Sequence, residues 1–126
     1  MFEEEENVIK VIRGNKATIS VEIQDFSFNA GDKVFFKVFE TAGLGKTPLI
    51  NKEINVEEGK SNFDINLSGA DTLIGEVINE PKEYWYEINL NNDLSLLSYD
   101  DDGPKILILY PKGAAINAEK SIAIKG

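Results

Sequence analysis

Residues 40–48 read ETAGLGKTP, and the GLGKT core matches the end of the phosphate-binding loop pattern G-x-x-x-x-G-K-[ST]. Gly45, Lys46 and Thr47 fill the last three required positions, but Glu40 stands where the first glycine is required. The following segment, PLINKEINV, contains β-branched residues and no helical apolar stripe, so we expect a strand there. No helix N-terminus would then face an anion. A hairpin loop explains the glycines without a nucleotide.

The densest group of carboxylates is DDDG at 100–103, and hard cations such as calcium bind oxygen ligands of this kind. Asp100 and Asp102 are therefore the weak metal candidates of the sequence. The EF-hand pattern fails, because its fifth position is Pro104 and its twelfth, which needs a glutamate, is Pro111. A tight turn with Asp-Gly at its tip accounts for the same residues.

The aromatic run Tyr84, Trp85 and Tyr86 suggests a second kind of chemistry, because flat aromatic faces can stack on sugar rings. Alternation in a strand would place Tyr84 and Tyr86 together in the core and leave Trp85 on the opposite face. A single tryptophan is a weak sugar platform. Carbohydrate binding at a bacterial surface therefore remains the alternative interpretation.

The composition excludes several classes of function. The 126 residues include no cysteine and no histidine, so thiol chemistry and Ser–His nucleophiles are excluded. We expect no enzyme and no cofactor. The formal net charge of −9 opposes binding to nucleic acid and to anionic membranes. The opening MFEEEENV differs from a secretion signal, so we expect synthesis in the cytoplasm without a signal peptide.

Short alternating segments separated by turn residues organise the chain and predict an antiparallel β-sandwich of immunoglobulin-like type. Ser68 is a good helix N-cap, and we expect one short helical turn near 68–78. We divide the chain into an acidic tail (1–7), a sandwich domain (8–112) and a C-terminal extension (113–126). The extension adds a strand or docks on a partner. The expected strands are 7–13, 16–23, 33–40, 48–56, 61–67, 82–90 and 104–111.

An apolar second face distinguishes three of these strands. If 33–40, 82–90 and 104–111 share one sheet, its outward positions hold large apolar side chains, where an antiparallel sheet is normally polar. Such patches mark interaction sites unless another segment, here 68–81 or the C-terminal extension, covers them. The predicted interaction patch consists of Phe35, Phe39, Trp85, Leu107 and Leu109.

The order of the segments resembles a known family, the N-terminal immunoglobulin-like domain of baseplate upper proteins and related tail proteins of phages and prophages of Gram-positive bacteria. The matching pieces lie between about Ile9 and about Pro111. They are IRGNKATISVEI, GDKVFFKV, SNFDINLSGADT and YWYEINL. The resemblance implies a non-enzymatic structural role in a virion or phage-like particle. Its implied partners are further copies of the chain or other tail and baseplate proteins, and it assigns no catalytic residues.

Overall fold

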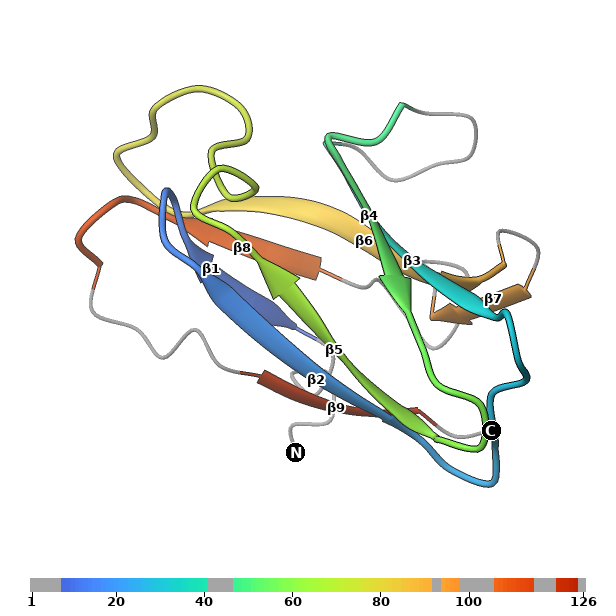
Figure 1. Cartoon of the computed structure of the whole chain (residues 1–126). Helices are drawn as coiled ribbons and strands as arrows, with labels where there is room; N and C mark the ends of the chain where they lie inside the picture. Colours follow the sequence, from blue (N-terminus) through green and yellow to red (C-terminus); the bar gives the residue numbers. More distant parts are fainter. Residues whose placement is uncertain (1–7, 41–46, 92–93, 98–105, 115–119, 125–126) are drawn as a thin grey trace.

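The computed structural model describes residues 8–40, 47–91, 94–97, 106–114 and 120–124 (Figure 1). These residues form strands, turns and no helix, which confirms the expected all-β fold. None of the described segments is a helix with the length and apolarity of a membrane span. The strands are β1 (Ile9–Ile12), β2 (Ala17–Ile23), β3 (Lys33–Phe39), β4 (Ile50–Asn55), β5 (Asn62–Leu67), β6 (Lys82–Leu90), β7 (Leu94–Leu97), β8 (Ile106–Tyr110) and β9 (Lys120–Ile124).

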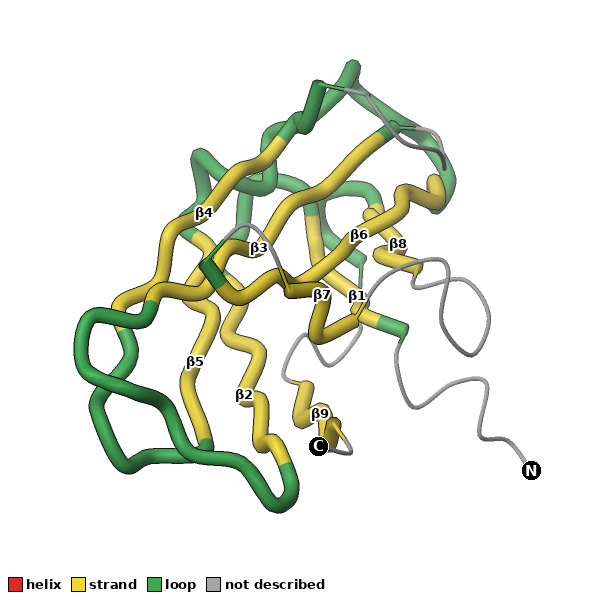
Figure 2. Tube along the Cα trace, turned by 90° about the vertical axis from the view of Figure 1, so that its right-hand side faces the viewer, coloured by secondary structure: helices red, strands yellow, loops and turns green. Residues whose placement is uncertain are grey.

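The strands form two layers (Figures 1 and 2). The larger sheet has the order β1-β8-β6-β3-β4, with β7 paired to β6, and the smaller sheet has the order β5-β2-β9. Strands β2 and β5 take the places of immunoglobulin strands B and E, while β3, β6 and β8 take those of C, F and G. The predicted β-sandwich is therefore the observed architecture, and its strand order is compatible with the immunoglobulin-like type.

Two strand pairs are parallel, which corrects the expectation of a purely antiparallel sandwich. β1 pairs in parallel with β8, and β9 pairs in parallel with β2. Neither pair is joined by a hairpin, because the chain changes layers between its members, and such crossover connections permit parallel pairing. β9 lies within the 113–126 extension, where it adds a strand to the smaller sheet.

The core fills the space between the two inner sheet faces. β2 and β5 alternate strictly between buried and exposed residues, as expected for strands with one face on the core. Phe28 packs edge-on against Phe26 and Phe63, with ring centroids 5.2 and 5.9 Å apart. These aromatic contacts close the end of the core near the β2–β3 connection. The other large side chains buried most completely are Ile9, Ile19, Ile23, Phe36, Ile65, Tyr84, Tyr86, Ile88, Leu107 and Leu109.

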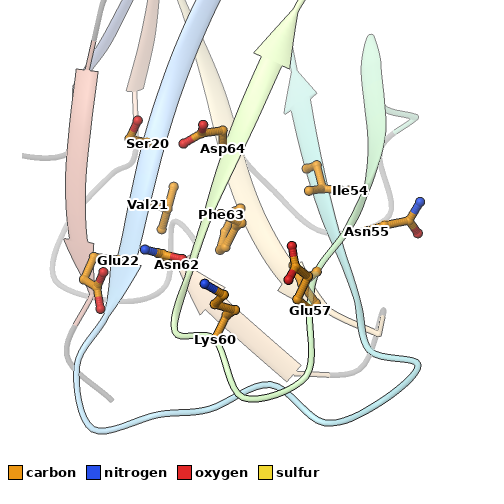
Figure 3. A pocket seen from close by; sticks show the side chains of 11 residues that line it. Ser20, Val21, Glu22, Ile54, Asn55, Glu57, Lys60, Asn62, Phe63 and Asp64 are labelled. Atoms are coloured by element: carbon orange, nitrogen blue, oxygen red, sulfur yellow. The ribbon is translucent and has the colours of Figure 1, made fainter.

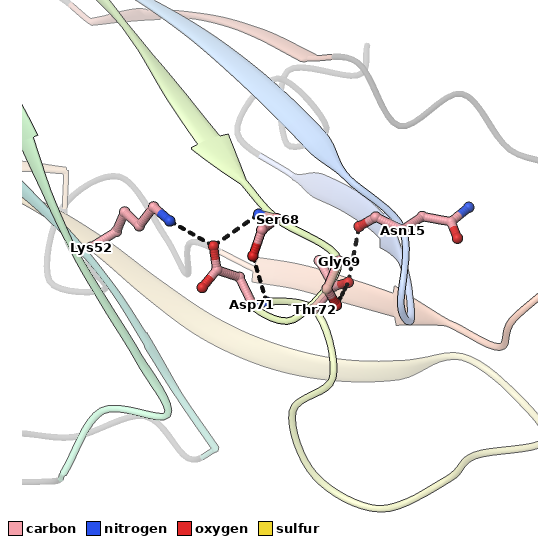
Figure 4. Close-up of polar contacts among 6 residues, drawn as sticks. All are labelled: Asn15, Lys52, Ser68, Gly69, Asp71 and Thr72. Carbon is pink, nitrogen blue, oxygen red and sulfur yellow. Dashed lines mark hydrogen bonds and ion pairs between the residues drawn. The ribbon is translucent and has the colours of Figure 1, made fainter.

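The segment after β5 makes a single helical turn (Figure 4). The Ser68 hydroxyl accepts a hydrogen bond from the Asp71 amide (3.1 Å), and the Asp71 carboxylate accepts one from the Ser68 amide (2.8 Å). This reciprocal pair is the capping pattern of a helix start. One helical backbone bond follows, from the Thr72 amide to the Ser68 carbonyl (3.3 Å). Gly75, at φ +69°, lies in the left-handed region, which ends the turn before a helix forms.

Polar contacts of Asp71 and Thr72 hold this turn to the sandwich on two sides (Figure 4). Lys52 on β4 forms an ion pair with Asp71 at 2.7 Å. The Thr72 hydroxyl accepts a hydrogen bond from the Gly14 amide and donates one to the Asn15 carbonyl, both at 2.9 Å. The turn therefore fastens the β1–β2 turn to the edge strand β4, and it lies on this flank and not on the outer face of the larger sheet.

Candidate functional site

We define the outer face as the residues of β1, β3, β4, β6 and β8 whose side chains point away from the smaller sheet. On β3, the core positions Val34, Phe36 and Val38 are fully buried, whereas the outward Phe35 and Phe39 are only half-buried. Trp85 on β6 is likewise half-buried between buried neighbours. The three predicted patch residues on these two strands therefore point outward, as expected.

Three of the outward apolar residues stand side by side across three strands. Phe39 is the direct neighbour of Trp85, and Trp85 is in turn the direct neighbour of Ile106 on β8. Directly opposite residues in a sheet have Cβ atoms about 4.5–5.5 Å apart, so these side chains can contact one another. We call Phe39, Trp85 and Ile106 the apolar row.

Leu107 and Leu109 do not belong to the outer face, which corrects two of the five predicted patch residues. Both are 0% exposed and lie in the core. The prediction failed because β8 reads ILILY, where every position is apolar and alternation cannot show which residues face inward. The half-buried Ile106, Ile108 and Tyr110 take the outward positions instead.

The structure separates Phe35 from the apolar row. Phe35 lies opposite Asn89 on β6 and Glu53 on β4. Between Phe35 and Phe39 stands Lys37, whose direct neighbour on β6 is Glu87. Phe35 is therefore a second, isolated apolar position with polar neighbours.

The sequence missed Ile106, Ile108 and Tyr110 as outward residues. Ile108 is the direct neighbour of Glu83 on β6 and of Lys10 on β1, so it extends the apolar row toward the β1 edge. Only the pairing of β8 with β6 reveals this placement, since Trp85 faces outward and Ile106 is its partner. The local sequence carries no equivalent signal.

Charged groups of the outer face balance one another. The described outward residues include three lysines and three glutamates: Lys10, Lys33, Lys37, Glu53, Glu83 and Glu87. Lys33 and Glu53 form an ion pair at 2.8 Å beside Phe35, with both side chains 49% exposed. The apolar row is therefore bordered by a polar rim without net charge, although the chain as a whole carries −9.

Two described parts of the segments expected to cover this face, the 68–75 turn and β9, lie elsewhere. The 68–75 turn packs its Ile74 into the core cluster and binds the inward-facing Lys52. β9 belongs to the smaller sheet. Neither of these described segments shields the apolar row.

The other predicted sites fall largely outside the described residues. This holds for the metal candidates Asp100 and Asp102 and for Gly45 and Lys46 of the phosphate-loop fragment. The segment after that fragment forms strand β4, which confirms the expectation of a strand in place of a helix. Among the described residues, His, Cys, Asp and Glu form no group of three or more that could hold a metal ion.

Two titratable residues of the larger sheet, Lys82 and Tyr86, have raised pKa values. A hydrogen bond to Glu40 at 3.3 Å, followed by the electrostatic interaction with the Tyr84 phenol group, raises the pKa of Lys82 above its usual range. Both ends of this contact are exposed, so it contributes little stability. Burial raises the pKa of Tyr86 in the core, which keeps this phenol neutral.

The apolar row thus brings three large, half-buried side chains together on the outer face. No protein-family model and no curated protein matches this chain.

Proposed function

We propose that this chain is a non-enzymatic structural protein that assembles through the outer face of its larger sheet. The observation that carries the proposal is the apolar row Phe39–Trp85–Ile106, which lies half-buried on a face that antiparallel sheets usually keep polar. Aromatic residues surrounded by a polar rim are the arrangement typical of protein interfaces.

The partner that we propose first is a second copy of the chain. Two chains of charge −9 repel each other, but the three lysines and three glutamates of the outer face make this face locally neutral. Burial of the apolar row is then opposed by little like-charge repulsion. A face with a net negative charge would not permit the same contact.

The biological setting that we propose is a phage or prophage tail or baseplate. This part rests on the resemblance of the segments between about Ile9 and about Pro111, and the immunoglobulin-like strand order is compatible with it. The same sandwich serves many unrelated functions, so the fold alone does not choose the setting.

One observation favours carbohydrate binding as the second candidate function. Phe39 is the direct neighbour of Trp85, so two flat rings, where the sequence indicated only one, are available for stacking on a sugar. A monomer whose Trp85 fluorescence responds to bacterial surface polysaccharide would support this alternative.

Light scattering on a size-exclusion column, over a range of protein concentrations, tests the assembly. We expect an oligomer for the unmodified chain and a shift toward monomer for Trp85→Ser and for Phe39→Ser. Val77→Ser is the matched control, because Val77, at 81%, is the most exposed large apolar residue of the described part of the chain and lies outside the outer face. A chain that is monomeric at every concentration contradicts assembly between copies.

A further inference from the structure

A groove opens along the flank of the sandwich where both sheets end (Figure 3). β4 is the last strand of the larger sheet and β5 is the last strand of the smaller one. The cavity between them has a volume of about 660 Å³ and is lined by β2, β4, β5 and the connection from β4 to β5. Constant-type immunoglobulin domains carry one more strand beyond strand E, whereas here the chain passes directly from β4 to β5.

The backbone of β5 offers unpaired groups to this flank. In an antiparallel pair, opposite residues alternate between those that exchange backbone hydrogen bonds and those that point these groups away. The Ile23 amide donates to the opposite Ser61 carbonyl at 2.8 Å, so Ser61 belongs to the residues that bond to β2. By alternation, Phe63 and Ile65 bond to β2 as well. Asn62, Asp64 and Asn66 therefore direct their N–H and C=O groups toward the free edge. β5 pairs with β2 alone among the described strands.

The side chains of the groove combine an apolar floor with an acidic rim. Phe63 is 8% exposed at the floor, and the half-buried Ile54 and Val56 pack against the same core cluster. The charged residues of the lining are three carboxylates and one ammonium group, a net charge of −2. They are Glu22, Glu57, Asp64 and Lys60.

These carboxylates are available to a partner. Glu22 accepts a hydrogen bond from the Ser61 hydroxyl at 2.6 Å, and this contact leaves its charge uncompensated. Within the described residues, neither Asp64 nor Glu57 takes part in an ion pair. The groove thus contrasts with the locally neutral outer face, and the two surfaces suit different partners.

We infer that this groove binds an extended basic segment of a partner protein, which adds to β5 as a further strand. Strand addition gains affinity from backbone hydrogen bonds and specificity from the pockets that receive alternate side chains. Successive side chains of the added strand would point to opposite faces. Apolar side chains on one face would lie over Phe63, Ile54 and Val56, and lysine or arginine side chains on the other face would meet Asp64 and Glu22.

Two observations argue against segments of this same chain as the occupant: the N-terminal segment is acidic, and the lysine-containing β9 is already paired with β2. The chain carries −9 overall, and residues 3–6 are four consecutive glutamates. Such a segment would bring more negative charge to a groove that is already acidic. A basic segment of another protein is favoured, and this second surface is independent of the assembly proposed for the outer face.

A peptide titration followed by NMR tests the inference on the full chain. The probe is a blocked peptide of about seven residues alternating valine and lysine, a length that covers the edge from Asn62 to Asn66. We expect shifted amide signals and slowed amide exchange at Asn62, Asp64 and Asn66. The amides of Phe63 and Ile65, which already bond to β2, should change less. A peptide of alternating valine and glutamate should not bind.

Substitutions on the groove provide the second arm. Asp64→Lys should weaken binding of the basic peptide by about tenfold or more, whereas Glu83→Lys, the same charge change on the outer face, should alter it by less than about twofold. Asp64→Pro should also prevent binding, because it removes an N–H from the free edge and none from the β2 pairing. If either of these variants fails to fold, Glu57→Lys replaces it and should weaken binding in the same direction.

Three results overturn the inference: no amide change at the β5 edge with millimolar basic peptide, equal weakening by Asp64→Lys and Glu83→Lys, or equal binding of the acidic peptide. None of them bears on the oligomeric state, which light scattering measures separately. Failure of strand addition is therefore distinguishable from failure of the proposed assembly.

Discussion

Trp85 on β6 stands directly opposite Phe39 on β3, and the two aromatic residues are outward neighbours on a sheet whose inner face is a closed apolar core. Ile106 continues the row on β8. The larger sheet is thus apolar on both faces where the apolar row crosses it. Three features can be tested: which residues of its strands face the core, which contacts hold the 68–75 turn on its flank, and whether the chain assembles through the apolar row.

Substitution of two consecutive residues tests which side chains of β8 face the core. Leu107→Ala should lower the free energy of unfolding by about 2–5 kcal/mol, because it leaves a cavity in the core. Ile106→Ala should cost about 1 kcal/mol or less, since its side chain is half-buried on the outer face, and it should instead weaken assembly. Urea denaturation of both variants measures the difference. Equal losses of stability would show that Ile106 is also a core residue.

Thr72 is a buried residue, at 1% exposure, whose hydroxyl is bonded to the β1–β2 turn. Thr72→Val keeps the shape but leaves the Gly14 amide without its acceptor, so we expect a loss of about 1–3 kcal/mol in the free energy of unfolding. Thr72→Ser is the control, because it retains the hydroxyl and should cost about 0.8 kcal/mol for the lost methyl group. If chemical denaturation shows the Thr72→Val variant to be more stable than the Thr72→Ser variant, this hydrogen bond does not have the proposed role.

Gly75 and Tyr84 are predicted to be energetically coupled. A Cβ at Gly75 would lie 2.5 Å from the Tyr84 hydroxyl, which is buried and has no hydrogen-bond partner among the described residues. Tyr84→Phe should therefore leave stability unchanged or raise it by about 1 kcal/mol.

Gly75→Ala should destabilise the fold through its positive φ and this contact, and it should cost at least about 0.5 kcal/mol less in the Tyr84→Phe background. A thermodynamic cycle of the two single variants and the double variant gives the coupling energy. If the stability changes of the two single variants add up to that of the double variant, the contact between the added Cβ and the Tyr84 hydroxyl is ruled out. A large loss of stability in Tyr84→Phe alone would reveal a bound water at the hydroxyl.

The Lys52–Asp71 ion pair predicts a specific dependence of stability on pH. Burial alone would raise the pKa of Asp71, but hydrogen bonds from Lys52 and from the Ser68 amide outweigh it and lower the pKa below its ordinary value of 3.8. A carboxyl with a depressed pKa in the folded state stabilises the fold fully above its unfolded pKa. This contribution is lost as the pH falls through the folded pKa.

Asp71→Asn should accordingly be less stable than the unmodified chain by about 1 kcal/mol at pH 7, and this difference should begin to narrow below about pH 4, as the pH falls toward the lowered pKa of Asp71. Glu53→Gln is the matched control, because its ion pair with Lys33 is half-exposed and should contribute less than about 0.5 kcal/mol. Denaturation curves recorded between pH 7 and pH 3 decide the matter. If the difference in the free energy of unfolding is as large at pH 3 as at pH 7, the charge of Asp71 is not its cause.

Local patterns in the sequence were sufficient for much of the fold. The strict alternation of ATISVEI determines which face of β2 is buried, and Ser68 with Asp71 three residues later signals the capped turn. β7 was not expected, because its four residues follow β6 within a stretch that reads as a polar connection. The parallel pairs joined by β1 and β9 depend on contacts between distant segments, which no local pattern encodes.

The candidate site shows the same division. Alternation placed Phe35, Phe39 and Trp85 on the outer face, because each has buried neighbours of the opposite parity. It failed for Leu107 and Leu109, whose strand is apolar throughout, and only the pairing of Tyr84 with Leu107 resolves the ambiguity. The acidic groove was also missed, since its residues come from three strands and a connection that meet only in the folded chain.

Assembly through the apolar row is decided by the solution mass, from light scattering, of the unmodified chain beside Trp85→Ser, Phe39→Ser and the control Val77→Ser. We expect an oligomer for the unmodified chain and for the control, and a folded monomer for the two outer-face variants. A monomer in every case, or an oligomer that all three substitutions leave intact, would contradict assembly through the apolar row.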